Sequence, residues 1–220
     1  LPPGVSPPPV VTDVNCKICN APGLPAGLIA ILEAAGQAYN VPGSLVLSFL
    51  NNEGGLNVPW TDTNIWQRWS LCDTNISPSG ARGPFQILDA TWPGHQDDVK
   101  KDYPNFEAQF GRSPDRCYLL ESAYAAAQLI YTGHYGAPSY PYAACFGVNL
   151  NTGTPSDPSK SSCNWTQEDV MTASRQYLGY CAEAGKSSPY PAGTYNRDVL
   201  GDFSSWACTG TPGPIVPPGP

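Results

Sequence analysis

The stretch VPGSLVLSFLNNEGG, residues 41–55, has the pattern of a short helix that ends at a carboxylate. Pro42 suits the first turn of a helix, and the Gly-Gly pair after the glutamate stops it. Leu45 and Phe49 lie four residues apart and define the buried face. Glu53 is therefore expected at the negative end of the helix dipole, which favours the protonated form that a general acid needs. The alternative is a solvated glutamate that merely ends the helix.

Helical periodicity recurs in four other parts of the chain, and the class is expected to be mainly α. The four parts are residues 24–40, 117–133, the segment that begins with Thr-Gln-Glu-Asp at 166–169, and 194–203. The alanine-rich stretch 117–133 is expected to be the central buried helix, because small residues allow close packing. The Thr-Gln-Glu-Asp start is typical of a capping box.

Loops are predicted where Pro, Ser, Asn, Gly and Trp accumulate, and no stretch alternates clearly like a strand. The predicted loops are residues 57–79, 97–114 and 137–164.

Proline-rich sequences flank these elements, with five prolines in the first ten residues and five in the last twelve. Such sequences favour extended polyproline structure. We therefore predict an N-terminal tail over residues 1–22, one compact helical domain with long disulfide-held loops over 23–208, and a C-terminal tail over 209–220. Free tails usually fray, and an ordered tail needs a contact with either the domain's own surface or a neighbouring chain.

The eight cysteines indicate disulfides. A zinc site would want a second closely spaced pair beside Cys16-Lys-Ile-Cys19, so disulfides are favoured, and neither a metal nor a cofactor is expected. Eight cysteines allow 105 pairings, and the sequence does not choose among them. Disulfides imply an oxidising compartment. The chain starts at Leu1 without a leader, and we expect a secreted or cell-surface protein whose signal peptide has been removed.

The charge balance excludes some partners. Eleven basic and 18 acidic residues give a net charge of −7, and no stripe of Lys or Arg could follow phosphates, so nucleic acid is not an expected partner. The apolar stretches are far too short to cross a bilayer. The same negative charge also disfavours adsorption to anionic surfaces.

Two segments resemble motifs of the soluble lytic transglycosylase and goose-type lysozyme superfamily. Residues 41–58 resemble its helix followed by Glu-Ser-x-Phe-Asn-Pro, and SGARGPFQILDATW, residues 79–92, resembles its Gly-Ala-x-Gly-Leu-Met-Gln-Ile segment. Residues 194–200 look like its closing helix. The resemblance implies an α+β lysozyme-like fold with Glu53 as the catalytic acid. It also implies that a loop lies against this acid and forms a sugar cleft, with contributions from Gly80, Ala81, Gly83, Phe85 and Gln86.

The chain departs from the family pattern at several points. Gly54 stands where the family has serine, and a Pro-Phe pair at 84–85 replaces its Leu-Met. Its Ala-Tyr-Asn-Ala-Gly segment has no clean match. Tyr177 or Tyr180 is the candidate for that tyrosine, and residues 143–147 are the weaker one.

The resemblance implies a secreted enzyme that cleaves the β-1,4 bond between N-acetylmuramic acid and N-acetylglucosamine in peptidoglycan or a related glycan. One glutamate suffices for a lytic transglycosylase, which forms a 1,6-anhydro product. A hydrolase would instead use a second carboxylate, for which Asp62, Asp73 and Asp89 are the nearby candidates. Each of the three is expected to cap a turn, so the transglycosylase is favoured.

Gln86 and a group of three tryptophans can each be interpreted either as sugar-binding or as structural residues. Gln86 can hold an N-acetyl or hydroxyl group of the glycan, or it can tie its loop to the helix that carries Glu53. Trp60, Trp66 and Trp69 can stack on sugar rings or cover the core, and Trp60 is taken as a substrate-binding residue.

A different class of function is also open. The chain can be a lysozyme-fold structural subunit of an extracellular assembly, joined through its proline-rich tails, or a glycan-binding module without turnover. The tails, the acidity and the imperfect motifs favour this alternative. Glu53 and Gln86, retained in the family's order, favour the enzyme.

Overall fold

The computed structural model describes residues 4–103, 105–135, 163–166, 169–170, 173–174, 177 and 194–208. Over these residues the chain is mainly helical, as predicted, and its only β-pairings are three isolated bridges. The described helices are α1 (Ala26–Ala38), α2 (Gly43–Asn52), α3 (Trp92–Asp102), α4 (Phe106–Phe110), α5 (Leu119–Tyr135) and α7 (Thr194–Trp206). Short 3-10 turns are η1 (Val14–Cys16), η2 (Gly55–Asn57) and η3 (Asn64–Trp66). In this described part, no helix has the length and apolar character needed to cross a membrane.

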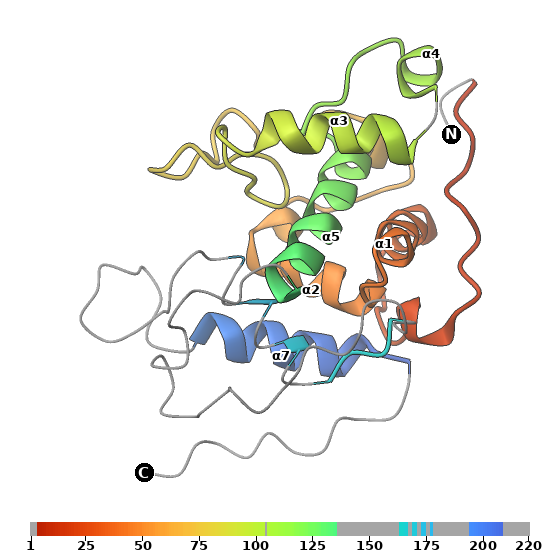
Figure 1. Ribbon diagram of the computed structural model, residues 1–220, viewed down its shortest axis with the longest axis vertical. Helices are drawn as coiled ribbons and strands as arrows, with labels where there is room; N and C mark the ends of the chain where they lie inside the picture. Colours follow the sequence, from red (N-terminus) through yellow and green to blue (C-terminus); the bar gives the residue numbers. More distant parts are fainter. Residues whose placement is uncertain are drawn as a thin grey trace.

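Helix α5 forms the centre of the molecule, as predicted for the alanine-rich stretch. Its residues Ala123, Ala126 and Ala127 are fully buried. Helix α1 packs on both α5 and α2, α3 packs on α5, and α7 packs on α2 (Figure 1). The core therefore lies between α5 and the α1–α2 pair, and α7 closes its lower side in the view of Figure 1.

Helix α2 begins and ends where the sequence predicts. Pro42 is its N-cap, with extended backbone. Its C-cap is Glu53, whose backbone N–H donates to the carbonyls of Phe49 and Asn51. Gly54 then adopts φ +86°, a left-handed conformation that favours glycine and ends the helix.

The predicted capping box after Cys163 is also present. The backbone N–H of Thr166 donates to Asp169 Oδ2 at 2.7 Å, and the N–H of Asp169 lies 3.2 Å from Thr166 Oγ1. All five described residues from 169 to 177 are helical, and Val170 and Ser174 are fully buried. The segment therefore packs on the core through the predicted face.

The prediction of a loop over residues 97–114 is wrong, because α3 and α4 occupy much of it. Helix α3 buries only one of its apolar residues, Val99, so it lacks the periodic stripe that identifies a helix in sequence. Polar contacts hold it instead. His95 Nδ1 lies 2.6 Å from Gln128 Oε1 on α5, and Gln96 Nε2 donates to the carbonyl of Pro114 at 2.7 Å.

The N-terminal segment lies on the surface of its own domain. Val5 and Val11 are buried. The hydroxyl of Tyr103 donates to the carbonyl of Ser6 at 3.0 Å, and the N–H of Ser6 donates to Gln109 Oε1 at 3.2 Å. Figure 1 shows this extended segment beside α1. From residue 4 onward the domain itself holds this segment; the predicted C-terminal tail lies outside the described residues.

The described residues contain three disulfides, so the prediction of disulfides is confirmed for these six cysteines. They join Cys16 to Cys163, Cys19 to Cys208, and Cys72 to Cys117. The two cysteines of the Cys-Lys-Ile-Cys segment therefore have different partners, and both fix the N-terminal segment to later parts of the chain. Cys145 and Cys181 lie outside the described residues.

Candidate functional site

The two motif segments lie against each other. Glu53 is partly buried at the end of α2. Two residues later, a Cβ atom added to Gly55 would lie 2.6 Å from the carbonyl oxygen of Pro84. Only glycine permits so close an approach of the two backbones. The end of α2 and the 80–88 loop thus form one unit.

The 80–88 loop is a tight turn closed by a β-bridge. Arg82 and Ile87 exchange backbone hydrogen bonds of 2.9 and 3.1 Å. Gly83 has φ +80°, and a Cβ atom there would lie 2.1 Å from the carbonyl oxygen of Arg116. Gly83 is buried in this contact, so its place in the structure is a packing position rather than a surface that faces a sugar.

Gln86 ties two loops together. Its backbone is left-handed, with φ +51°. Its Nε2 group donates to the carbonyl of Asn75 at 3.1 Å and to that of Gly83 at 3.0 Å. Both amide hydrogens are therefore used, and only Oε1 is left to accept from a ligand. The partner of the 80–88 loop in this tie is the 57–79 loop, whereas the alternative interpretation of Gln86 in the sequence is a tie to α2.

Tyr177 reaches the same place from a distant part of the chain. Its hydroxyl donates to the carbonyl of Phe85 at 2.7 Å, and its ring centroid lies 4.6 Å from that of Phe49 on α2. Burial raises the pKa of Tyr177 well above its usual value, and the charge of Glu53 raises it further. Tyr177 thus lies beside Glu53 and the loop, while Tyr180 lies outside the described residues.

The predicted aromatic contacts with sugar differ from what the structure shows. Phe85 is fully buried, and Trp60 and Trp69 are 7% and 2% exposed. Trp60 Nε1 donates to the carbonyl of Gly55 at 2.9 Å. These rings belong to the hydrophobic core, so Phe85 and Trp60 have packing positions rather than present a face to a ligand.

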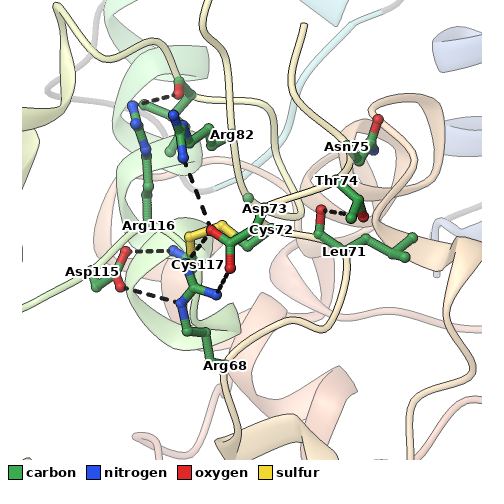
Figure 2. The surroundings of a disulfide bond; sticks show 12 residues. Arg68, Leu71, Cys72, Asp73, Thr74, Asn75, Arg82, Asp115, Arg116 and Cys117 are labelled. Carbon is green, nitrogen blue, oxygen red and sulfur yellow. Dashed lines mark hydrogen bonds and ion pairs between the residues drawn. A yellow bond between two sulfur atoms is a disulfide. The ribbon is translucent and has the colours of Figure 1, made fainter.

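The three aspartates considered for a hydrolase have other surroundings. Arg68 donates to both carboxylate oxygens of Asp73, at 2.5 and 2.8 Å, and this contact lowers the pKa of Asp73. Figure 2 shows Arg68 between Asp73 and Asp115, beside the Cys72–Cys117 disulfide. Asp89 pairs with Arg116. Arginine side chains therefore bind both Asp73 and Asp89. The prediction was that each would cap a turn, and the structure shows ion pairs instead.

Asp62 belongs to a separate surface pocket of about 380 Å³. Pro7 and Pro8, the first turn of α1, and the side chains of Ile65 and Trp66 form the rest of its wall. None of these residues belongs to the Glu53 site.

Sequence reasoning missed two amides and one carboxylate near Glu53. A Cβ atom on Gly54 would lie 3.0 Å from Asn57 Nδ2 and 3.5 Å from Asn75 Nδ2. Asp202 Oδ2 on α7 accepts from the side-chain amides of the two residues that precede Glu53, Asn51 at 2.8 Å and Asn52 at 2.9 Å. Asn57 lies within the first motif segment, but no local sequence signal indicates the contacts of Asn75 and Asp202, because these residues come from the 57–79 loop and from α7.

No protein-family model matches this chain, and no curated protein matches it significantly. Within the described residues, no group of three or more His, Cys, Asp or Glu side chains is arranged to hold a metal ion.

Proposed function

We propose that the chain is a secreted lysozyme-like enzyme that cleaves the β-1,4 bond between N-acetylmuramic acid and N-acetylglucosamine in peptidoglycan, with Glu53 as general acid and base. The observation that carries the proposal is the assembly of Glu53, the 80–88 loop and Tyr177 from three distant parts of the chain. The superfamily that the sequence resembles has a glutamate, a glutamine loop and a tyrosine in this order.

The proposed reaction needs only one carboxyl group. Glu53 donates its proton to the glycosidic oxygen as the bond from that oxygen to C1 breaks. The resulting carboxylate then takes the proton of the sugar's own 6-hydroxyl, whose oxygen bonds to C1 and gives a 1,6-anhydro product. Glu53 ends in the state in which it began. The arginine partners of Asp73 and Asp89 favour this route over hydrolysis with a second carboxylate.

Tyr177 would act as a positioning residue in this reaction. A phenol is neutral over the whole range in which a glutamate titrates, and the raised pKa of Tyr177 extends its neutral range further. Its proton is directed at the carbonyl of Phe85, so the ring holds the 80–88 loop beside Glu53.

The test is mass spectrometry of fragments released from purified peptidoglycan by the oxidised protein, with Glu53→Gln as the matched control. Anhydro-ended fragments that are absent from the control are the expected result. Fragments with reducing ends would refute the transglycosylase and leave a hydrolase. No release by folded protein from several wall types would refute both.

The non-enzymatic alternatives have mixed support. The net charge of −7 works against adsorption to an anionic wall and favours a structural subunit. However, the N-terminal segment lies on its own domain from residue 4 onward, which weakens the case for assembly through that tail. Binding of chitin oligomers without cleavage would identify a glycan-binding module. The absence of both binding and cleavage would favour the structural subunit.

A further inference from the structure

We propose that the side-chain amides of Asn57 and Asn75 bind the carbonyl oxygen of a substrate N-acetyl group beside Glu53. This inference rests on the proposed function and adds two specificity-determining residues to it. Asn57, the last residue of η2, stands at the Asn of the Glu-Ser-x-Phe-Asn-Pro motif, whereas Asn75 lies in the 57–79 loop, outside the superfamily motifs.

The position of the two amides follows from Gly54. This residue has φ +86°, and the space that a side chain would fill lies against Asn57 Nδ2 and Asn75 Nδ2. The family's serine at this position would be strained and would meet both amides. Two N–H donors therefore take its place next to the proposed acid.

The side-chain N–H groups of Asn57 and Asn75 are available to donate to a ligand. Among the described residues, the side-chain amides of Asn57 and Asn75 have no acceptor. Asn57 is exposed and Asn75 is partly exposed, so both can reach a ligand. Gln86, the amide that the sequence favoured for this role, has used both of its N–H groups. In the described part of the site, the side-chain amide donors for a substrate carbonyl are thus the two asparagines.

The backbone holds the two asparagines in place before a ligand arrives. The N–H of Asn57 donates to the carbonyl of Gly54 at 3.1 Å. The N–H of Asn75 donates to the carbonyl of Leu71 at 2.7 Å, and its own carbonyl accepts from Gln86. Figure 2 shows Asn75 and Leu71 on the loop that the Cys72–Cys117 disulfide fixes. Because the backbone at both residues is fixed, only the side-chain torsions lose freedom on binding, which favours specificity.

A carbonyl oxygen has two lone pairs and can accept from both amides. The acetamido group of a 2-acetamido sugar supplies such an oxygen, whereas the deacetylated sugar presents an ammonium group there. Donors that face an ammonium group stay unpaired, and sites of this kind discriminate strongly against the wrong substrate. The inference therefore predicts a preference for acetylated over deacetylated glycan.

The test measures binding of chitin tetramer and chitosan tetramer by calorimetry. Glu53→Gln serves as the background, so that turnover does not interfere. Adding Asn57→Ala and Asn75→Ala should weaken binding of the acetylated tetramer about tenfold or more and leave the deacetylated tetramer unaffected. Asn164→Ala is the matched control, because it removes an exposed asparagine far from the proposed site. Asn164 lies next to Cys163, and the disulfide partner of Cys163, Cys16, lies against Gly43 at the start of α2, whereas Glu53 lies at the end of α2.

Three results would overturn the inference separately from the proposed function. Unchanged binding of acetylated tetramer by the folded double variant would remove the asparagines from the site and leave the enzyme proposal intact. A glycan located on Asn75 of the native protein by peptide mass mapping would do the same, because Asn75-Ile-Ser77 is a glycosylation sequon and the attached sugar would occupy the amide. Failure of the Glu53→Gln background to bind either tetramer would refute the acetyl-binding role of the asparagines, and fragment release from peptidoglycan would still decide the enzyme proposal.

Discussion

Replacing Gly83 by alanine tests the packing of the 80–88 loop. The residue has φ +80°, which costs a non-glycine residue about 1–2 kcal/mol. In addition, the new Cβ atom would meet the carbonyl oxygen of Arg116 at 2.1 Å. The clashing atom belongs to the backbone, so the loop itself must shift, and overpacking of this kind costs about 1–3 kcal/mol more. We expect the free energy of unfolding to fall by about 2–5 kcal/mol in urea titrations of the oxidised protein.

Gly23→Ala is the matched control for this variant. Gly23 has φ +83°, and no heavy atom outside its chain neighbours lies within 4 Å of the position of an added Cβ atom. Its substitution carries the conformational strain without the clash, and the reduced entropy of the unfolded chain offsets part of that strain. Equal losses in the two variants would show that Gly83 serves only its backbone angle, and the account of loop packing would be wrong.

Two other predictions concern the regions around the site. Replacing Cys72 and Cys117 together by alanine opens a loop of sequence separation 45, and urea titration should show a loss of up to about 4 kcal/mol; an unchanged midpoint would contradict this. Arg112→Met removes the ion-pair partner of buried Glu121. Burial already raises the pKa of this glutamate. A buried glutamate left without its partner costs about 3–5 kcal/mol of folding stability at neutral pH. Because a raised folded-state pKa favours the protonated carboxyl, stability is lost as pH rises through that pKa, so the penalty should be smaller at pH 4 than at pH 7. A penalty independent of pH would contradict the prediction.

The sequence predicts α2 and the place of Glu53 well, because the signals are local. Pro42 fixes the start, Gly54 needs the left-handed conformation, and the apolar spacing between them defines the buried face. The Thr166–Asp169 cap is local in the same way. These features need no knowledge of distant residues.

Helix α3 escapes prediction because polar partners on other elements stabilise it. Its sequence carries one buried apolar residue, Val99, and its contacts with Gln128 and with the carbonyl of Pro114 come from residues up to 33 positions away. Hydrophobic periodicity does not record such contacts.

The same difference between local signals and contacts with distant residues decides which parts of the site are predictable from the sequence. The resemblance indicates which motif segments meet, but it does not indicate which atoms face a ligand. Phe85 and Trp60 look like sugar-stacking residues until burial is known, and Gln86 looks like a ligand donor until both of its N–H groups are assigned. Asn75 becomes a candidate only once the loop that carries it is folded against Gly54.

The disulfides between the two ends of the chain make its backbone a closed covalent loop. Cys16 is joined to Cys163 and Cys19 to Cys208, so a single peptide-bond cut at any point between Cys16 and Cys208 leaves every fragment attached. This arrangement protects the fold against proteolysis, because a nick does not release a piece of it. On a gel, such nicked molecules would migrate as intact chains until a reductant separates them.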